Sequence, residues 1–90
     1  MTETFKKKLW RAQVVSSRGF SVRVLGRTGV EYKDGAGSLR INAETMAGPG
    51  MAVVVYAGSI PDTPRRPRRQ VLDDLYRAFA YAGWTLDVEQ

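Results

Sequence analysis

The sequence predicts an α+β fold, an antiparallel meander sheet of about five strands with one helix packed on one face. The expected order is ββββαβ, with a possible extra N-terminal strand. Short segments in which apolar and polar residues alternate between glycine-rich turns indicate half-buried strands. One longer segment, starting near residue 68, repeats apolar residues at helical spacing. With 90 residues, the chain has room for one domain, residues 1–90.

Three successive segments show the alternation of a half-buried strand: residues 20–24, 30–33 and 38–43. Gly35 and Gly37 lie between the second and the third segment, where they permit the positive φ of a tight connection. If these strands pair in register, Glu31 lies between Arg23 and Arg40 as cross-strand pairs. We therefore expect three strands of a meander here.

The next strand is predicted over residues 51–56, which are apolar without alternation. A strand of this kind is typical of a sheet covered on both faces, so we expect this segment to be the central strand. The turn before it is predicted at residues 47–50, because Pro49 cannot continue a ladder of hydrogen bonds.

A helix follows the proline-rich loop at residues 59–64. Asp62 or Thr63 is expected to cap it, and Pro64 or Pro67 to lie in its first turn. Six residues form one apolar stripe at helical spacing: Val71, Leu72, Leu75, Ala78, Phe79 and Ala82. Gly83 then provides a left-handed end, and alternation over residues 84–89 predicts a last strand that returns to the sheet.

The N-terminal segment, residues 1–17, fits two descriptions. Val14 and Val15 favour an extra strand, whereas Lys6, Lys7 and Lys8 suit a partly ordered basic arm. Residues 1–18 carry a net charge of +4 and residues 61–72 a net charge of +3, out of +5 for the whole chain. Such a chain can attract an acidic partner or a phosphate backbone.

The composition excludes several classes of protein. With no cysteine and no histidine, the chain lacks the usual thiolate and imidazole ligands of metals and the usual general base. We expect no catalytic residue, no metal and no cofactor. Neither an export signal nor an apolar run of the ~20 residues that cross a bilayer is present, so a cytoplasmic location is expected.

Two motifs that resemble ligand sites are better explained as structure. The glycines around residues 26–29 and 47–50 lack the spacing of a phosphate-binding loop and are interpreted as turns. Asp73 and Asp74 are adjacent on the helix, so their side chains diverge by about 100° and cannot share a metal. We interpret Asp73 and Asp74 as part of a solvated face of the helix. Asp73 is spaced to form an ion pair with Arg77.

The most distinctive feature is a cluster of four arginines before and within the first turn of the helix: Arg65, Arg66, Arg68 and Arg69. Four guanidinium groups at a helix N-terminus can bind a carboxylate or a phosphate. The competing interpretation is a solvated loop that favours solubility. These arginines are our candidate partner-binding residues.

Several of these segments together resemble the immunity protein 74 family of bacterial polymorphic toxin systems, over about residues 19–89. The resemblance rests on Gly26-Arg27-Thr28-Gly29 with Glu31-Tyr32, on residues 38–44 leading to Ala47-Gly48-Pro49, on residues 55–60, and on Ala82-Gly83 before the final strand. It implies a non-enzymatic protein that neutralises a cognate toxin by binding it.

Our leading hypothesis is therefore a small cytoplasmic protein that binds a protein partner, such as a toxin encoded nearby. The net charge of +5 favours an acidic partner over a basic one. A nucleic-acid-binding module that uses Lys6–Lys8 and Arg65–Arg69 is the alternative. A small α+β domain with only a structural or interaction role is a third interpretation.

Overall fold

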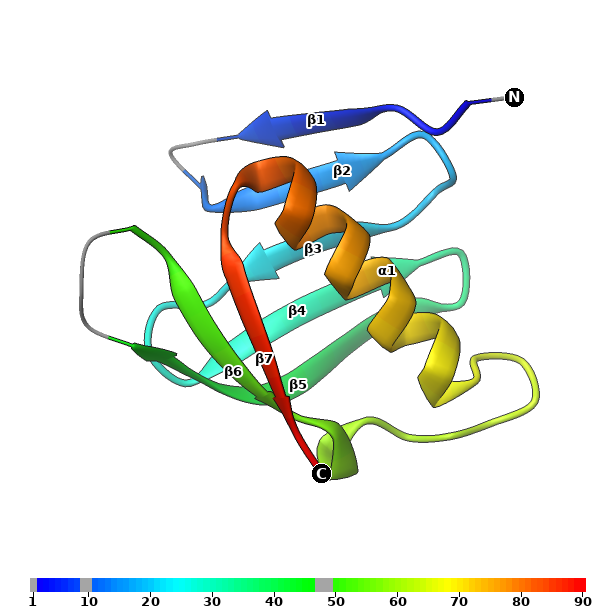
Figure 1. Ribbon diagram of the computed structural model, residues 1–90. Helices are drawn as coiled ribbons and strands as arrows, with labels where there is room; N and C mark the ends of the chain where they lie inside the picture. The colour runs from blue at the N-terminus through cyan, green and yellow to red at the C-terminus, as the bar shows by residue number, and fades with distance from the viewer. Residues whose placement is uncertain (1, 9–10, 47–49) are drawn as a thin grey trace.

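The computed structural model describes residues 2–8, 11–46 and 50–90. In these residues seven strands pair into one sheet, and a single helix crosses one face of it (Figure 1). The strands lie in the sheet in sequence order: β1 (Phe5–Lys8), β2 (Gln13–Ser16), β3 (Ser21–Val24), β4 (Gly29–Asp34), β5 (Gly37–Met46), β6 (Ala52–Tyr56) and β7 (Thr85–Glu89). The short 3-10 turn η2 (Ala57–Ser59) and the helix α1 (Arg68–Ala82) connect β6 to β7. The predicted α+β class, the meander and the single helix are confirmed.

The sheet is mixed rather than wholly antiparallel. Neighbouring strands from β1 to β6 are antiparallel, but β7 pairs parallel to β6, with Val53 opposite Leu86 and Val55 opposite Val88. A parallel neighbour requires a crossover connection, and α1 provides it.

The N-terminal segment, for which the sequence left open one extra strand or a partly ordered basic arm, forms two strands. Phe5 pairs with Ser16 at the start of the β1–β2 hairpin. Two inward-facing side chains attach β1 to the helix. The Phe5 ring stacks on Tyr81 with centroids 5.1 Å apart, and Lys7 donates from Nζ to the Ala82 carbonyl at 2.7 Å. A lysine at a helix C-terminus satisfies an unpaired carbonyl and complements the helix dipole.

The register of the predicted meander is confirmed at Glu31, which lies opposite Arg23 on β3 and Arg40 on β5. The Arg23 Nε atom is 3.9 Å from Glu31 Oε1. Arg40 instead reaches the hydroxyl of Thr28 at 3.5 Å. An ion pair forms on one side of Glu31 only.

The prediction that residues 51–56 form the central strand is wrong, because β6 is the sixth strand of seven. Val53 and Val55 are buried, whereas Ala52 and Val54 are half-buried on the opposite face. The long strand β5 explains this position. Its first part pairs with β4 and its last part, from Ala43, pairs with β6. Of the predicted turn at residues 47–50, residues 47–49 lie outside the described residues.

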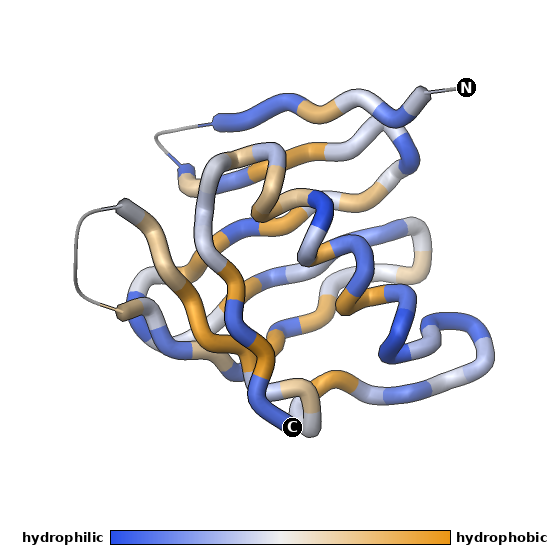
Figure 2. The backbone as a smooth tube through the Cα atoms, in the orientation of Figure 1, coloured by the Kyte–Doolittle hydropathy of each residue, from blue (hydrophilic) through white to orange (hydrophobic). Residues whose placement is uncertain are grey.

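The core lies between α1 and the inner face of the sheet. Figure 2 shows hydrophobic residues recurring along the strands and along the helix. The buried apolar residues of the helix are those of the predicted stripe except Leu72, which is half-buried: Val71, Leu75, Ala78, Phe79 and Ala82. They face the strand residues Val14, Val22, Val30, Ile41, Val53 and Val55, which are also buried. Each fully buried valine, leucine, isoleucine or phenylalanine side chain contributes about 1.5–3 kcal/mol to the free energy of folding.

Residues just outside the helix form hydrogen bonds with backbone groups of its first and last turns. Pro67 is the N-cap and has no side-chain oxygen, but Asp62 Oδ1 accepts the Arg68 N–H at 3.0 Å. Asp62 therefore caps the helix as predicted, whereas Thr63 bonds to Arg66 within the loop. Gly83 ends the helix with a φ of 76°, as predicted.

We predict that Gly83→Ala lowers the free energy of unfolding by about 1–2 kcal/mol, because an L side chain is strained at this φ. Gly35→Ala is the matched control, since Gly35 has no positive φ and an added Cβ would meet no atom within 4 Å. Urea unfolding measures both changes. Equal losses would contradict the explanation from backbone strain.

Candidate binding site at the start of the helix

The side chain that fixes the helix to the sheet is the carboxylate of Asp74, which is only 4% exposed. It accepts a hydrogen bond from the Tyr32 hydroxyl at 2.7 Å and one from Gln70 Nε2 at 2.9 Å, and it is ion-paired with Arg77. The prediction that Asp74 lies on a solvated face is wrong. Because neighbouring helix residues point about 100° apart, Asp73 faces solvent while Asp74 faces β4.

The protonation of Tyr32 supports this arrangement. Burial, and then the hydrogen bond to Asp74, raise the pKa of Tyr32 well above its ordinary value of 10.0. The phenol therefore remains protonated at neutral pH and remains a donor to the buried carboxylate.

Arg77 connects the helix to the N-terminal segment. Its Nε atom donates to Asp73 at 3.1 Å, which confirms the predicted pair, and its guanidinium also binds Asp74 and Glu3. Burial alone raises the pKa of Glu3, but the Ser16 hydroxyl, Arg77 and Arg18 outweigh burial and leave this pKa below 4.5. Glu3 is therefore a charged contact that fixes the chain before β1 against α1.

Two of the four candidate arginines hold the loop in place. Arg66 donates to Asp34 through Nε at 3.2 Å and through Nη2 at 2.6 Å, and Nη2 also donates to the Gly37 carbonyl at 2.8 Å. Arg68 donates from Nε to the Ile60 carbonyl at 2.8 Å. Both side chains therefore have partners within the chain. The hydrogen bond from Arg66 also lowers the pKa of Asp34 below 3.8.

Arg65 and Arg69, the other two candidates, are exposed, and neither side chain forms a hydrogen bond or an ion pair with any residue that the structure describes. The fold therefore does not bring the four arginines into one cluster. It places one free guanidinium on each side of the start of α1.

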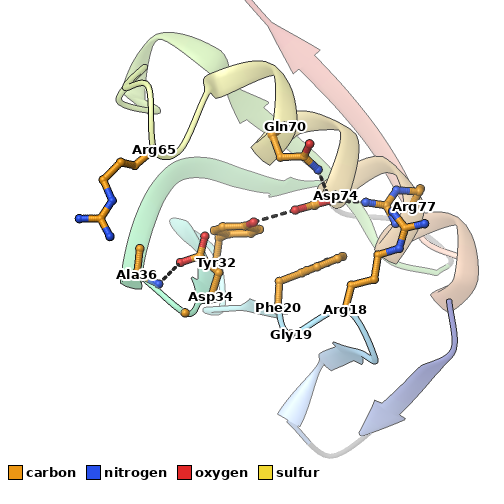
Figure 3. A pocket seen from close by; sticks show the side chains of 11 residues that line it. Arg18, Gly19, Phe20, Tyr32, Asp34, Ala36, Arg65, Gln70, Asp74 and Arg77 are labelled. Atoms are coloured by element: carbon orange, nitrogen blue, oxygen red, sulfur yellow. Dashed lines mark hydrogen bonds and ion pairs between the residues drawn. The ribbon is translucent and has the colours of Figure 1, made fainter. Parts of the chain in front are cut away.

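Arg65 borders a hollow of about 430 Å³ between α1 and the β4–β5 turn. Figure 3 shows Arg65 on one side of this hollow and Arg18 with Arg77 on the other, with Tyr32 between them. The two carboxylates of the hollow, Asp34 and Asp74, are already bonded to donors of the chain. The exposed guanidinium of Arg65 therefore has no acidic neighbour that neutralises it.

Arg69 borders a second hollow, of about 440 Å³, on the other side of the helix. It is also lined by Leu72, which is half-buried, by Tyr76, which is 50% exposed, and by Asp62, Arg68 and Asp73. Arginine and tyrosine beside an apolar side chain are typical of the residues that contribute most to protein interfaces. Tyr76 is not among our sequence-predicted site residues. An aromatic residue outside the apolar stripe of an amphipathic helix is the signal that indicates it.

No metal-binding group was found in the described part of the chain, where no three acidic, histidine or cysteine side chains come together suitably. Among the same residues, no helix has the length and apolar character needed to span a membrane. Comparisons with known protein families, with curated proteins and with solved structures gave no match.

We predict that Arg66→Ala lowers the free energy of unfolding by about 2 kcal/mol, because it removes a paired charge-assisted contact to Asp34 and a bond to Gly37. Arg65→Ala, the same change one residue earlier, leaves stability nearly unchanged. Urea unfolding at pH 7 compares the two variants. A similar loss in both would show that the loop does not depend on Arg66.

The pH dependence of stability follows from the lowered pKa of Asp34. A carboxylate of this kind stabilises the fold fully above the unfolded-state pKa, near 3.8, and loses its contribution as the pH falls through the lower folded-state value. We therefore expect Asp34→Asn to be less stable than the parent at pH 7, with a difference that shrinks toward pH 2. Urea unfolding across this range measures it. A stability difference that grows toward low pH would contradict the lowered pKa of Asp34 in the folded state.

Proposed function

We propose that the protein is a small non-enzymatic binding protein that acts in the cytoplasm and occludes an acidic protein partner. This is the role that its resemblance to the immunity protein 74 family implies, and the partner would then be a toxin encoded nearby. The contact surface is the helix-start surface, which we define as Arg65, Arg69, Leu72 and Tyr76.

The observation that carries the proposal is the division of the arginine cluster. Arg66 and Arg68 are bonded within the chain, whereas Arg65 and Arg69 are exposed and their guanidinium groups form no ion pair with a described residue. The guanidinium group of Arg69, beside an exposed tyrosine and a half-buried leucine, can meet a carboxylate and an apolar contact of a partner together, and Arg65 adds a second cation on the other side of the helix start. Opposite potentials on two surfaces accelerate association and select the partner.

Rigidity of the loop is a second support. The bonds from Arg66 to Asp34 and from Arg68 to Asp62 hold the segment from which Arg65 and Arg69 project. A surface that is ordered before binding loses less conformational entropy on association. Order in the helix-start surface before binding therefore lowers the entropic cost of association.

The alternative of a nucleic-acid module that combines Lys6–Lys8 with Arg65–Arg69 is less compatible with the fold. Lys6 and Lys8 face away from the helix on β1, and Lys7 is bonded to the end of α1. The free arginines lie at the opposite end of the helix, on the other side of the sheet (Figure 1). The two basic segments therefore form two separate surfaces.

The test is binding to the product of the adjacent gene, measured by titration calorimetry, together with protection of cells that produce both proteins. We expect Arg65→Gln/Arg69→Gln and Tyr76→Ala each to weaken binding at least tenfold, as losses at interface hot spots do. Lys33→Gln/Arg40→Gln is the matched control, because it removes the same charge from the sheet and leaves the helix-start surface intact. Absence of binding, or an equal loss in the control, would overturn the proposal.

A further inference from the structure

The register of the sheet creates a basic surface on the side away from the helix. Residues that pair directly across strands point to the same face. One row crosses five strands and consists of Lys8, Gln13, Arg23, Glu31 and Arg40. None of these five residues is buried.

A second row runs parallel to the first and consists of Lys6, Val15, Ser21, Lys33 and Ser38. We call the two rows together the outer face of β1–β5. It carries the cations Lys6, Lys8, Arg23, Lys33 and Arg40, and the carboxylate of Glu31. The net charge of these two rows is therefore +4, and Glu44, farther along β5 on the same side of the sheet, lies outside them.

Little within the chain neutralises these charges. Glu31 is paired with Arg23, at 3.9 Å, and Arg40 contacts only the neutral hydroxyl of Thr28. Within the described part of the chain, the side chains of Lys6, Lys8 and Lys33 form no hydrogen bond or ion pair. Four cations thus remain available to an external anion: Lys6, Lys8, Lys33 and Arg40.

The composition of the outer face decides which anion fits. Neither row contains an aromatic residue, although proteins that bind single strands stack bases on aromatic side chains. The only apolar side chain is that of Val15, whereas stable protein interfaces are built around buried aromatic or large apolar anchors. Cations without anchors are typical of contacts to the phosphate backbone of a duplex.

We propose that the outer face of β1–β5 binds the phosphate backbone of duplex nucleic acid without reading its sequence. From β1 to β5 the face spans four strand spacings, about 19 Å. This exceeds the width of the major groove, about 12 Å, so Lys6 and Lys8 at one end and Arg40 at the other can contact phosphates on both sides of a groove. The inference does not depend on the proposed protein partner, which contacts other residues.

The test is fluorescence anisotropy of the full chain with a labelled 20-base-pair duplex between 50 and 200 mM salt. Four phosphate contacts predict a slope of log affinity against log salt of about −3.6, which is a loss of about a hundredfold over this range. Lys33→Gln/Arg40→Gln removes two contacts and reduces the slope to about −1.8. Both substitutions are on exposed side chains, and circular dichroism verifies that the variant is folded.

The matched control is Arg65→Gln/Arg69→Gln, which removes the same charge from the helix-start surface and leaves the slope unchanged. An equal decrease of the slope in this control would show a non-specific charge effect and overturn the proposal. So would the absence of duplex binding at 50 mM salt. Tighter binding to a 20-nucleotide single strand, or to polyglutamate of equal charge, would also overturn it.

Discussion

The buried hydrogen bond between Tyr32 and Asp74 is the interaction on which the rest of the structure depends. Apolar contacts hold α1 against the sheet but do not determine where along it the helix lies, because hydrophobic burial has no direction. The carboxylate of Asp74, which is 4% exposed, needs hydrogen-bond donors because burial removes it from water. The hydroxyl of Tyr32 on β4 is one of these donors. The helix is thereby fixed in rotation and position against β4, which determines where the loop before it and the side chains at its start are placed.

The other polar contacts extend from this point in both directions. Arg77 binds Asp74 and Glu3, so the segment before β1 is joined to the helix. On the other side, Arg66 lies 5.8 Å from the centroid of the Tyr32 ring while it binds Asp34. One network of charges thus runs from the N-terminal segment through the helix to the loop. It leaves two arginines of the predicted cluster exposed, and their exposure follows from the bonds of their neighbours.

Much of the fold could be predicted from the sequence, because alternation and the helical stripe reflect burial directly. The position of Glu31 opposite both Arg23 and Arg40 follows from register alone. The N-terminal hairpin was harder to predict, since the inward-facing Lys7 breaks the pattern of a strand and is explained only by the Ala82 carbonyl that accepts its hydrogen bond. The division of the arginine cluster also lay beyond sequence reasoning. Arg65 and Arg66 are chemically identical, and only the path of the loop determines which one reaches Asp34.

The strand β1 has a further consequence for the behaviour of the protein in concentrated solution. It is an edge strand of the sheet. The backbone donors and acceptors along its outer edge can therefore pair with a strand of another chain. It is only four residues long, and three of these are lysines. Because like charges repel when two such edges approach, the lysines oppose aggregation through edge-to-edge strand pairing. Replacement of these lysines by neutral residues therefore lowers solubility, an effect that no contact within the folded chain reveals.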